Sequence, residues 1–153
     1  MSAATVERAD WRDVITREEL APLLETNDWR SGLSIALDWG IVAASLALVY
    51  VWPNLWTVIV ALVLIGARQL GFAVMMHETS HRSLLRNRRL NDWVGNWLCA
   101  YPIWSDPDPY RPYHLQHHAR TGSDEDPDLG LVLPFPITRS SFRRKAWRDL
   151  SGQ

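Results

Sequence analysis

The chain has 153 residues, which is enough for one ordinary domain, and its formal net charge is −1. That charge argues against a nucleic-acid partner, since no broad basic field exists to hold phosphates. The only cysteine, Cys99, excludes an internal disulfide and a cysteine-ligated iron–sulfur cluster within one chain. Nine tryptophans is a high count, and tryptophan favours membrane–water interfaces.

Residues 1–32 form a polar N-terminal segment that lacks the apolar core of a cleavable signal peptide. Thr16 and Glu19 have the spacing of a capping box. They stand ahead of Leu20, Leu23 and Leu24. We expect a short amphipathic helix here, either solvated or lying on a membrane surface.

Two long apolar runs follow, at residues 33–52 and 55–76, separated by Pro53 and Asn54. Each run has the roughly 20 residues that a bilayer-spanning helix needs. Trp52 and Trp56 bracket the turn, as interface anchors do. The runs therefore predict a transmembrane helical hairpin over residues 33–76. The alternative is a pair of buried helices in a soluble protein.

The positive charges predict the orientation of the hairpin. The turn carries none, whereas arginines lie on both flanks: Arg8, Arg12, Arg17 and Arg30 before it, and Arg82, Arg86, Arg88 and Arg89 after it. Positively charged residues stay in the cytoplasm, so both termini are expected there.

Asp38 and Arg68 are charges inside the predicted spans, where an ionisable residue is costly without a partner. If the helices turn between residues 52 and 55, paired positions sum to about 107, which places Asp38 level with Gln69. We expect Asp38 and Arg68 to face each other and to fix the register of the hairpin. The alternative is that each side chain reaches the interface separately.

The remainder, residues 77–153, is predicted to be a cytoplasmic region of interfacial helices. Its apolar stretch at 93–104 is too short to cross a bilayer. Three prolines in SDPDPYRP, residues 105–112, argue against a continuous helix there, so we expect a helix to restart near Tyr113. Residues 124–128, DEDPD, form an acidic turn.

Residues 138–150, TRSSFRRKAWRDL, predict another helix. Four apolar residues fall toward one face of this helix: Phe142, Ala146, Trp147 and Leu150. Five basic side chains lie among them. This pattern fits a helix on an anionic membrane surface, and it also fits a plain cytosolic surface helix.

All five histidines lie in two short motifs, HETSH at residues 77–81 and HLQHH at residues 114–118. On helices, His77 and His81 share one face, and so do His114, His117 and His118. Grouped imidazoles suit zinc, copper, iron or nickel. HETSH also satisfies HExxH, in which Glu78 would be the general base of a zinc peptidase. A single catalytic zinc takes three protein ligands, however, and leaves HLQHH unexplained, whereas two metals use both motifs.

The motifs together resemble the membrane fatty acid desaturase family, a histidine-box non-haem di-iron group that includes hydroxylases and ketolases. HETSH is similar to its first box, H-x-x-x-H, and HLQHH to its second, H-x-x-H-H. The stretch HHARTGSDEDPD and the preceding hairpin also match. The resemblance implies an all-α integral membrane fold: a two-helix hairpin followed by helices that carry the histidine boxes.

The resemblance further implies two iron ions, with His77, His81, His114, His117 and His118 among their ligands. Dioxygen would be the co-substrate, a fatty acyl chain or other membrane lipid the substrate, and the product most readily a double bond. We find no dinucleotide-binding fingerprint, so a ferredoxin or cytochrome would donate electrons. Glu78 would at most orient an imidazole. The same role is open to the acidic side chains of the DEDPD turn, which are Asp124, Glu125, Asp126 and Asp128.

The family carries a third histidine box after a second pair of spans, and these 153 residues contain neither. We therefore expect the chain to correspond to the N-terminal half of a family member, supplying part of an iron site. Besides this hypothesis, two others remain open: a zinc-dependent membrane peptidase that uses HETSH, and a non-catalytic remnant that keeps the hairpin.

Overall fold

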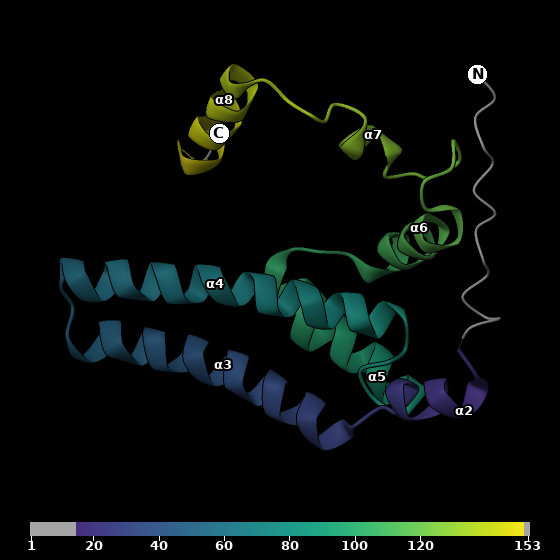
Figure 1. The fold of residues 1–153 in the computed structure, drawn as a ribbon. Helices are drawn as coiled ribbons and strands as arrows, with labels where there is room; N and C mark the ends of the chain where they lie inside the picture. Colours follow the sequence, from purple (N-terminus) through teal and green to yellow (C-terminus); the bar gives the residue numbers. More distant parts are fainter. Residues whose placement is uncertain (1–14, 152–153) are drawn as a thin grey trace. The chain divides into compact units, whose positions relative to one another are not determined.

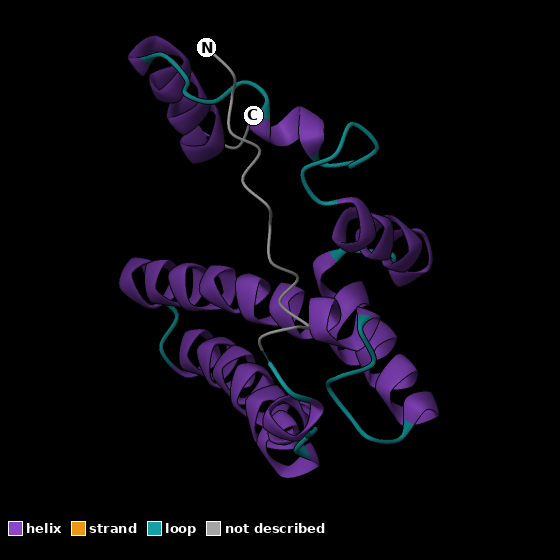
Figure 2. Cartoon of the chain, turned by 45° about the vertical axis from the view of Figure 1, so that its right-hand side comes forward, coloured by secondary structure: helices purple, strands orange, loops and turns teal. Residues whose placement is uncertain are grey.

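The computed structural model describes residues 15–151, and within that range the regular structure is entirely helical (Figure 2). The chain divides into two compact units, one ending at Pro107 and the other beginning at Asp108. Each unit is described by itself. The predicted all-α class is confirmed for the described residues. The predicted role of Arg8 and Arg12 falls outside them.

The N-terminal capping box is confirmed. The Glu19 backbone N–H donates to Thr16 Oγ1 at 3.2 Å, and the Thr16 N–H donates to Glu19 Oε2 at 2.9 Å. The helix that follows is short: α2 spans Arg17–Leu20 and passes into a 3₁₀ turn, η1, over Ala21–Leu24. Pro22 stands in that turn and cannot donate a hydrogen bond to an α-helix continuing from α2.

The two apolar runs form long helices, α3 at Asp28–Val51 and α4 at Leu55–Ser80, which lie side by side and antiparallel (Figure 1). Asn27 caps α3, and Asn54 caps α4 in a reciprocal pair with Thr57. At 1.5 Å per residue the helices measure about 36 and 39 Å, which exceeds a bilayer's hydrocarbon core of about 30 Å.

Both helices are apolar enough to cross a membrane. Only 11% and 17% of the residues in their most apolar windows are buried inside the protein. Helices of a soluble core bury a wide apolar stripe, so this low burial disfavours the alternative of two core helices.

The predicted ion pair between the helices is confirmed. Arg68 Nη1 donates to Asp38 Oδ1 at 2.8 Å, and Asp38 is only 6% exposed. Gly71 makes this approach possible, because a Cβ there would stand 2.2 Å from Asp38 Oδ2. The close packing of Asp38 on α4 therefore fixes how α3 and α4 are aligned.

A second layer packs against the C-terminal half of α4. It comprises α5 at Arg88–Val94, a π-helical turn η2 at Gly95–Ala100 and a 3₁₀ turn η3 at Tyr101–Ile103. The Trp39 indole N–H donates to the Leu98 carbonyl at 3.1 Å, and the Trp39 ring lies 5.2 Å from that of Phe72. Trp39 thus ties the short apolar stretch to both helices of the hairpin.

The second unit contains α6 at Pro107–Arg120, α7 at Leu129–Val132 and α8 at Arg139–Ser151. The expectation that a helix restarts only near Tyr113 is wrong, because α6 begins six residues earlier. Pro107 and Pro109 occupy the first turn of α6, where N–H groups have no acceptor within the helix. Only Pro112 removes an internal hydrogen bond, and α6 tolerates it.

Candidate metal centre

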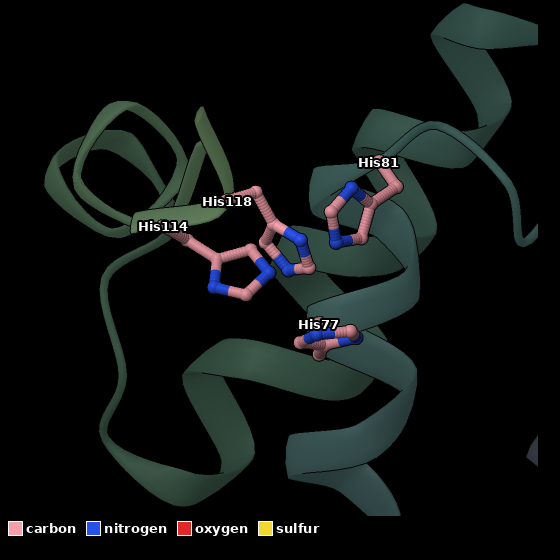
Figure 3. A group of neighbouring side chains, drawn as sticks. All are labelled: His77, His81, His114 and His118. Atoms are coloured by element: carbon pink, nitrogen blue, oxygen red, sulfur yellow. The ribbon is translucent and has the colours of Figure 1, made fainter. Parts of the chain in front are cut away.

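HETSH occupies the C-terminal end of α4. His77 lies in the last turn, and His81 is the C-cap residue with φ −82° and ψ −7°. Their rings are 4.9 Å apart between centroids, and Figure 3 shows both on the same side of the helix. The expectation that these two imidazoles share one face is confirmed.

Glu78 is hydrogen-bonded beside this pair. Its Oε1 lies 3.1 Å from His77 Nδ1, and its Oε2 accepts from Ser83 Oγ at 2.8 Å. A carboxylate at Nδ1 places the proton on that nitrogen and leaves the Nε2 lone pair as the donor to a metal. This contact is the one expected of a carboxylate that orients an imidazole.

The end of α4 is anchored by Asn91 of α5, which is fully buried. Asn91 Nδ2 donates to the Thr79 carbonyl at 3.0 Å, and the Leu85 N–H donates to Asn91 Oδ1 at 3.2 Å. Gly95 packs directly against Thr79. A Cβ at position 95 would lie only 2.4 Å from Thr79 Oγ1, so no side chain fits there. Asn91 and Gly95 therefore hold Thr79 in place, and Thr79 lies between His77 and His81.

Sequence reasoning did not single out Asn91 or Gly95. A usable signal existed for Asn91, because an amide close to the apolar stretch at 93–104 must find partners if it is buried. Gly95 offered no comparable signal, since its packing partner Thr79 lies 16 residues earlier in the sequence.

HLQHH lies in the second half of α6. The ring centroids of His114 and His118 are 4.5 Å apart, those of His117 and His118 5.6 Å, and those of His114 and His117 6.3 Å. His114 is only 8% exposed and stacks on Tyr110, with centroids 5.2 Å apart and planes 7° from parallel. The expected clustering of the three imidazoles is confirmed within this unit.

Asp126 faces His117 from the acidic turn, with Oδ1 2.7 Å from His117 Nδ1. Backbone groups of the acidic turn hold Asp126 in place. The Gly122 N–H donates to Asp126 Oδ2 at 3.0 Å, and the Asp128 N–H donates to Asp126 Oδ1 at 2.9 Å. Chiefly through the bond from His117, the pKa of Asp126 falls to about 2. The same bond raises the pKa of His117 above its usual value.

The other acidic residues of the turn differ in their contacts. Asp128 Oδ2 lies 3.4 Å from His117 Nδ1, and Asp128 Oδ1 accepts a hydrogen bond from the Tyr113 hydroxyl. Glu125 pairs instead with Arg120 at 2.9 Å. Of the four carboxylates considered from sequence, Asp126 and Asp128 are therefore the two that approach an imidazole.

The chemistry of these donors fits a first-row transition metal. Neutral imidazoles suit iron, and a carboxylate behind an imidazole raises its basicity and fixes its tautomer. In each unit at least one histidine has such a carboxylate at Nδ1. Figure 3 labels His77 and His81 of α4 in the first unit, and His114 and His118 of α6 in the second.

A helical chain with two groups of imidazoles, each with a carboxylate at one Nδ1, has side chains that could hold metal ions. The family model for fatty acid desaturases matches residues 50–153, which include both histidine motifs. The chain belongs to the fatty acid desaturase family. No solved structure matches it.

Three curated relatives illustrate the range of the family. Dihydrorhizobitoxine desaturase from Bradyrhizobium elkanii is 35% identical over 72% of this chain and 32% of its own length. Beta-carotene 4-ketolase 3 from Haematococcus lacustris is 36% identical over 50% of this chain and 28% of its own. An sn-1 acyl-lipid omega-3 desaturase (ferredoxin) from Synechocystis sp. is 25% identical over 74% and 30%. The chain spans about a third of the length of these relatives.

Proposed function

We propose that this chain carries part of the di-iron centre of a membrane-bound, O2-dependent lipid oxidoreductase that introduces a double bond into a fatty acyl chain. Family membership supports the oxidoreductase chemistry, and the desaturases among the relatives favour a double bond over a keto group. The observation that carries the proposal is the pairing of His117 with Asp126, because it prepares an imidazole for metal binding.

In this proposal all five histidines ligate iron: His77, His81, His114, His117 and His118. Because each motif supplies fewer ligands than two irons need, the two motifs act together. Glu78 and Asp126 hold the Nδ1 protons of His77 and His117 and so direct the Nε2 atoms toward metal. Iron, when bound, supplies the activation of dioxygen that a saturated C–H bond requires.

The hairpin α3–α4 spans the bilayer in this proposal, with both termini and both histidine motifs on the cytoplasmic side. The arginines on the flanks of the hairpin support this orientation. Electrons come from a separate donor of the ferredoxin or cytochrome type, and the ferredoxin in one relative's name supports that choice. The substrate is a lipid with an acyl chain long enough to reach the metal from the membrane.

Metal binding by the purified 153-residue chain in nanodiscs tests the proposal. Anaerobic titration with Fe(II), followed by elemental analysis, is expected to show bound iron. The alanine substitutions His81→Ala and His117→Ala should each lower the bound iron, while the chain still inserts into nanodiscs. Tyr50→Phe serves as the matched control, because Tyr50 is 88% exposed and lies at the turn end of α3, away from the end of the hairpin that carries HETSH. Absence of bound iron in the unsubstituted chain would contradict the proposal.

The zinc-peptidase alternative makes the opposite prediction about HLQHH. Zinc held by His77 and His81 alone would be retained when His114, His117 and His118 are replaced by alanine. Glu78→Gln would then abolish peptidase activity, because the general base is lost. In the di-iron proposal Glu78→Gln only weakens iron binding, since the amide oxygen can still accept from His77.

A further inference from the structure

The helix α8, Arg139–Ser151, has no buried residue among those the structure describes. A helix of 13 residues is marginal in water unless packing stabilises one of its faces. Yet its large apolar side chains are open: Phe142 is 62% exposed, Trp147 71% and Leu150 87%. Within the described residues, no other part of the chain therefore covers the apolar side chains of α8.

The apolar side chains of α8 lie toward one face. Phe142, Ala146 and Leu150 follow each other at intervals of four residues. Trp147 directly follows Ala146 and widens this stripe on one side. Ser141 points to the opposite side, since it is nine residues, or two and a half turns, from Leu150. An apolar stripe of this kind buries itself in a partner or in a lipid interface.

The positive charge of α8 indicates that its partner is an anionic surface. Five basic residues and one acidic residue, Asp149, give the helix a net charge of +4 (5 − 1). Lys145 Nζ pairs with Asp149 at 2.6 Å, and Arg148 Nε lies 3.6 Å from it. Arg139 and Arg143 stand eleven and seven residues before Leu150, about 20° to either side of it around the helix, so they lie within the apolar stripe. Their long side chains reach up to a plane of phosphates while the apolar side chains enter the acyl region. Exposed aromatics beside unneutralised arginines are the composition of an interfacial helix.

We propose that α8 docks on the anionic lipid surface of the membrane, with Phe142 and Leu150 inserted below the phosphates and Arg139 and Arg143 level with them. This inference rests on the membrane insertion proposed for the α3–α4 hairpin, which keeps the chain at a bilayer. A tethered helix meets that surface at a high effective concentration, so modest affinity is enough for docking. Docking gives the second unit a membrane attachment of its own.

Fluorescence depth measurements on the full chain in nanodiscs test this proposal. In a Cys99→Ala background, an environment-sensitive probe is attached to Leu150→Cys or, as the matched control, to Ser141→Cys on the opposite side. Nanodiscs contain phosphatidylcholine alone or with roughly 30% phosphatidylglycerol. With phosphatidylglycerol, the probe at 150 should shift to the blue. Lipid-borne quenchers should quench it about twofold or more relative to the probe at 141.

Charge substitutions provide the second arm. Arg139→Gln with Arg143→Gln should abolish the difference between the two probes, and Asp149→Asn should enlarge it. High salt should act like the arginine substitutions, since surface charges are screened. Recovery of labelled chain in the nanodisc fraction reports insertion of the hairpin separately. An inserted chain whose two probes stay equally exposed to water with phosphatidylglycerol would overturn the docking of α8. The same conclusion follows if the probe response is identical in both lipids.

Discussion

The two units hold their histidines by different means. In the first unit the residues around His77 and His81 are fixed by contacts between segments far apart in sequence: Asp38 with Arg68, Trp39 with Leu98, and Thr79 with Asn91 and Gly95. In the second unit His117 is fixed by Asp126, only nine residues away, and Asp128 is bonded to Tyr113.

This difference teaches which part of the site depends on the whole fold. Long-range contacts form only when α3, α4 and α5 are packed, so damage anywhere in the hairpin should reach the first histidine motif. A local carboxylate–imidazole contact closes a short loop at little entropic cost and is insensitive to events elsewhere. Substitutions in the first unit should therefore change the stability of the hairpin and metal binding together, whereas those in the second should change metal binding and leave the hairpin's stability unchanged.

The largest effect is expected at the ion pair of the hairpin. Arg68→Met leaves Asp38 charged and buried without a partner, which should lower the free energy of unfolding by about 3 kcal/mol or more. Adding Asp38→Ala should restore much of that loss, because the uncompensated charge is gone. Unfolding of the four variants of this double-mutant cycle in mixed detergent, followed by circular dichroism, measures the coupling.

A double variant as unstable as Arg68→Met alone would contradict a direct role for the pair in fixing the register of the hairpin. Exchanging the two charges is a less clean test than removal. Position 38 lies directly against Gly71, so it has little space for a guanidinium group.

The next effect concerns Gly95. Its replacement by alanine forces a methyl group onto Thr79, within a histidine motif, and should cost about 1–3 kcal/mol through overpacking. Iron binding should weaken in parallel, because Thr79 lies between His77 and His81. Gly40→Ala is the matched control, since a Cβ at Gly40 meets nothing within 4 Å. Thermal unfolding and Fe(II) titration measure the two effects, and equal behaviour of both variants would refute the proposed packing constraint.

A smaller effect, on metal binding and not on the hairpin, is expected at Asp126. Asp126→Ala should weaken iron binding roughly tenfold, about 1.4 kcal/mol, because His117 loses the group that fixes its tautomer. Asp126→Asn should fall between this variant and the unsubstituted chain, since an amide oxygen can still accept. The exposed Asp124→Asn is the control. Loss of hairpin stability in Asp126→Ala would contradict the expectation that this substitution leaves the hairpin unchanged.

The same contact predicts a pH dependence. Asp126 is ionised above about pH 2, so over the ordinary pH range it favours the protonated form of His117 and raises its pKa. Without metal, the contact stabilises the second unit most when the pH is below the ordinary histidine pKa, and this contribution is lost as the pH rises through the raised pKa of His117. NMR titration of the metal-free chain should place the His117 transition at lower pH in Asp126→Asn than in the unsubstituted chain.

The smallest effect is expected at Cys99, which is fully buried. Burial, followed by the nearby charge of Asp38, raises the pKa of its thiol to about 12. The thiolate is therefore absent at pH 8, and iodoacetamide should leave the folded chain unmodified while alkylating it in denaturant. Mass spectrometry distinguishes the two. Ready alkylation of the folded chain would indicate that the layer formed by α5 and η2 opens.

Much of this architecture was predictable from sequence, because its signals are periodic or local. Apolar runs of sufficient length gave the hairpin, and the positions of Asp38 and Arg68 relative to the turn gave their pairing. Histidine spacing alone placed the imidazoles of each motif on one face. The start of α6 was predicted wrongly because proline was counted as a helix breaker at positions where a helix end has no hydrogen bond to lose.

The sequence by itself determined the helices, their pairing in the hairpin and the two sets of clustered imidazoles, since each follows from residue spacing and chain geometry. Only the tertiary structure decided which neighbours hold them. It selected Asp126 from a run of acidic residues, placed Asn91 behind Thr79 and required Gly95 to lack a side chain. Such choices depend on where atoms of separate segments meet, and the order of residues along one segment does not encode that distance.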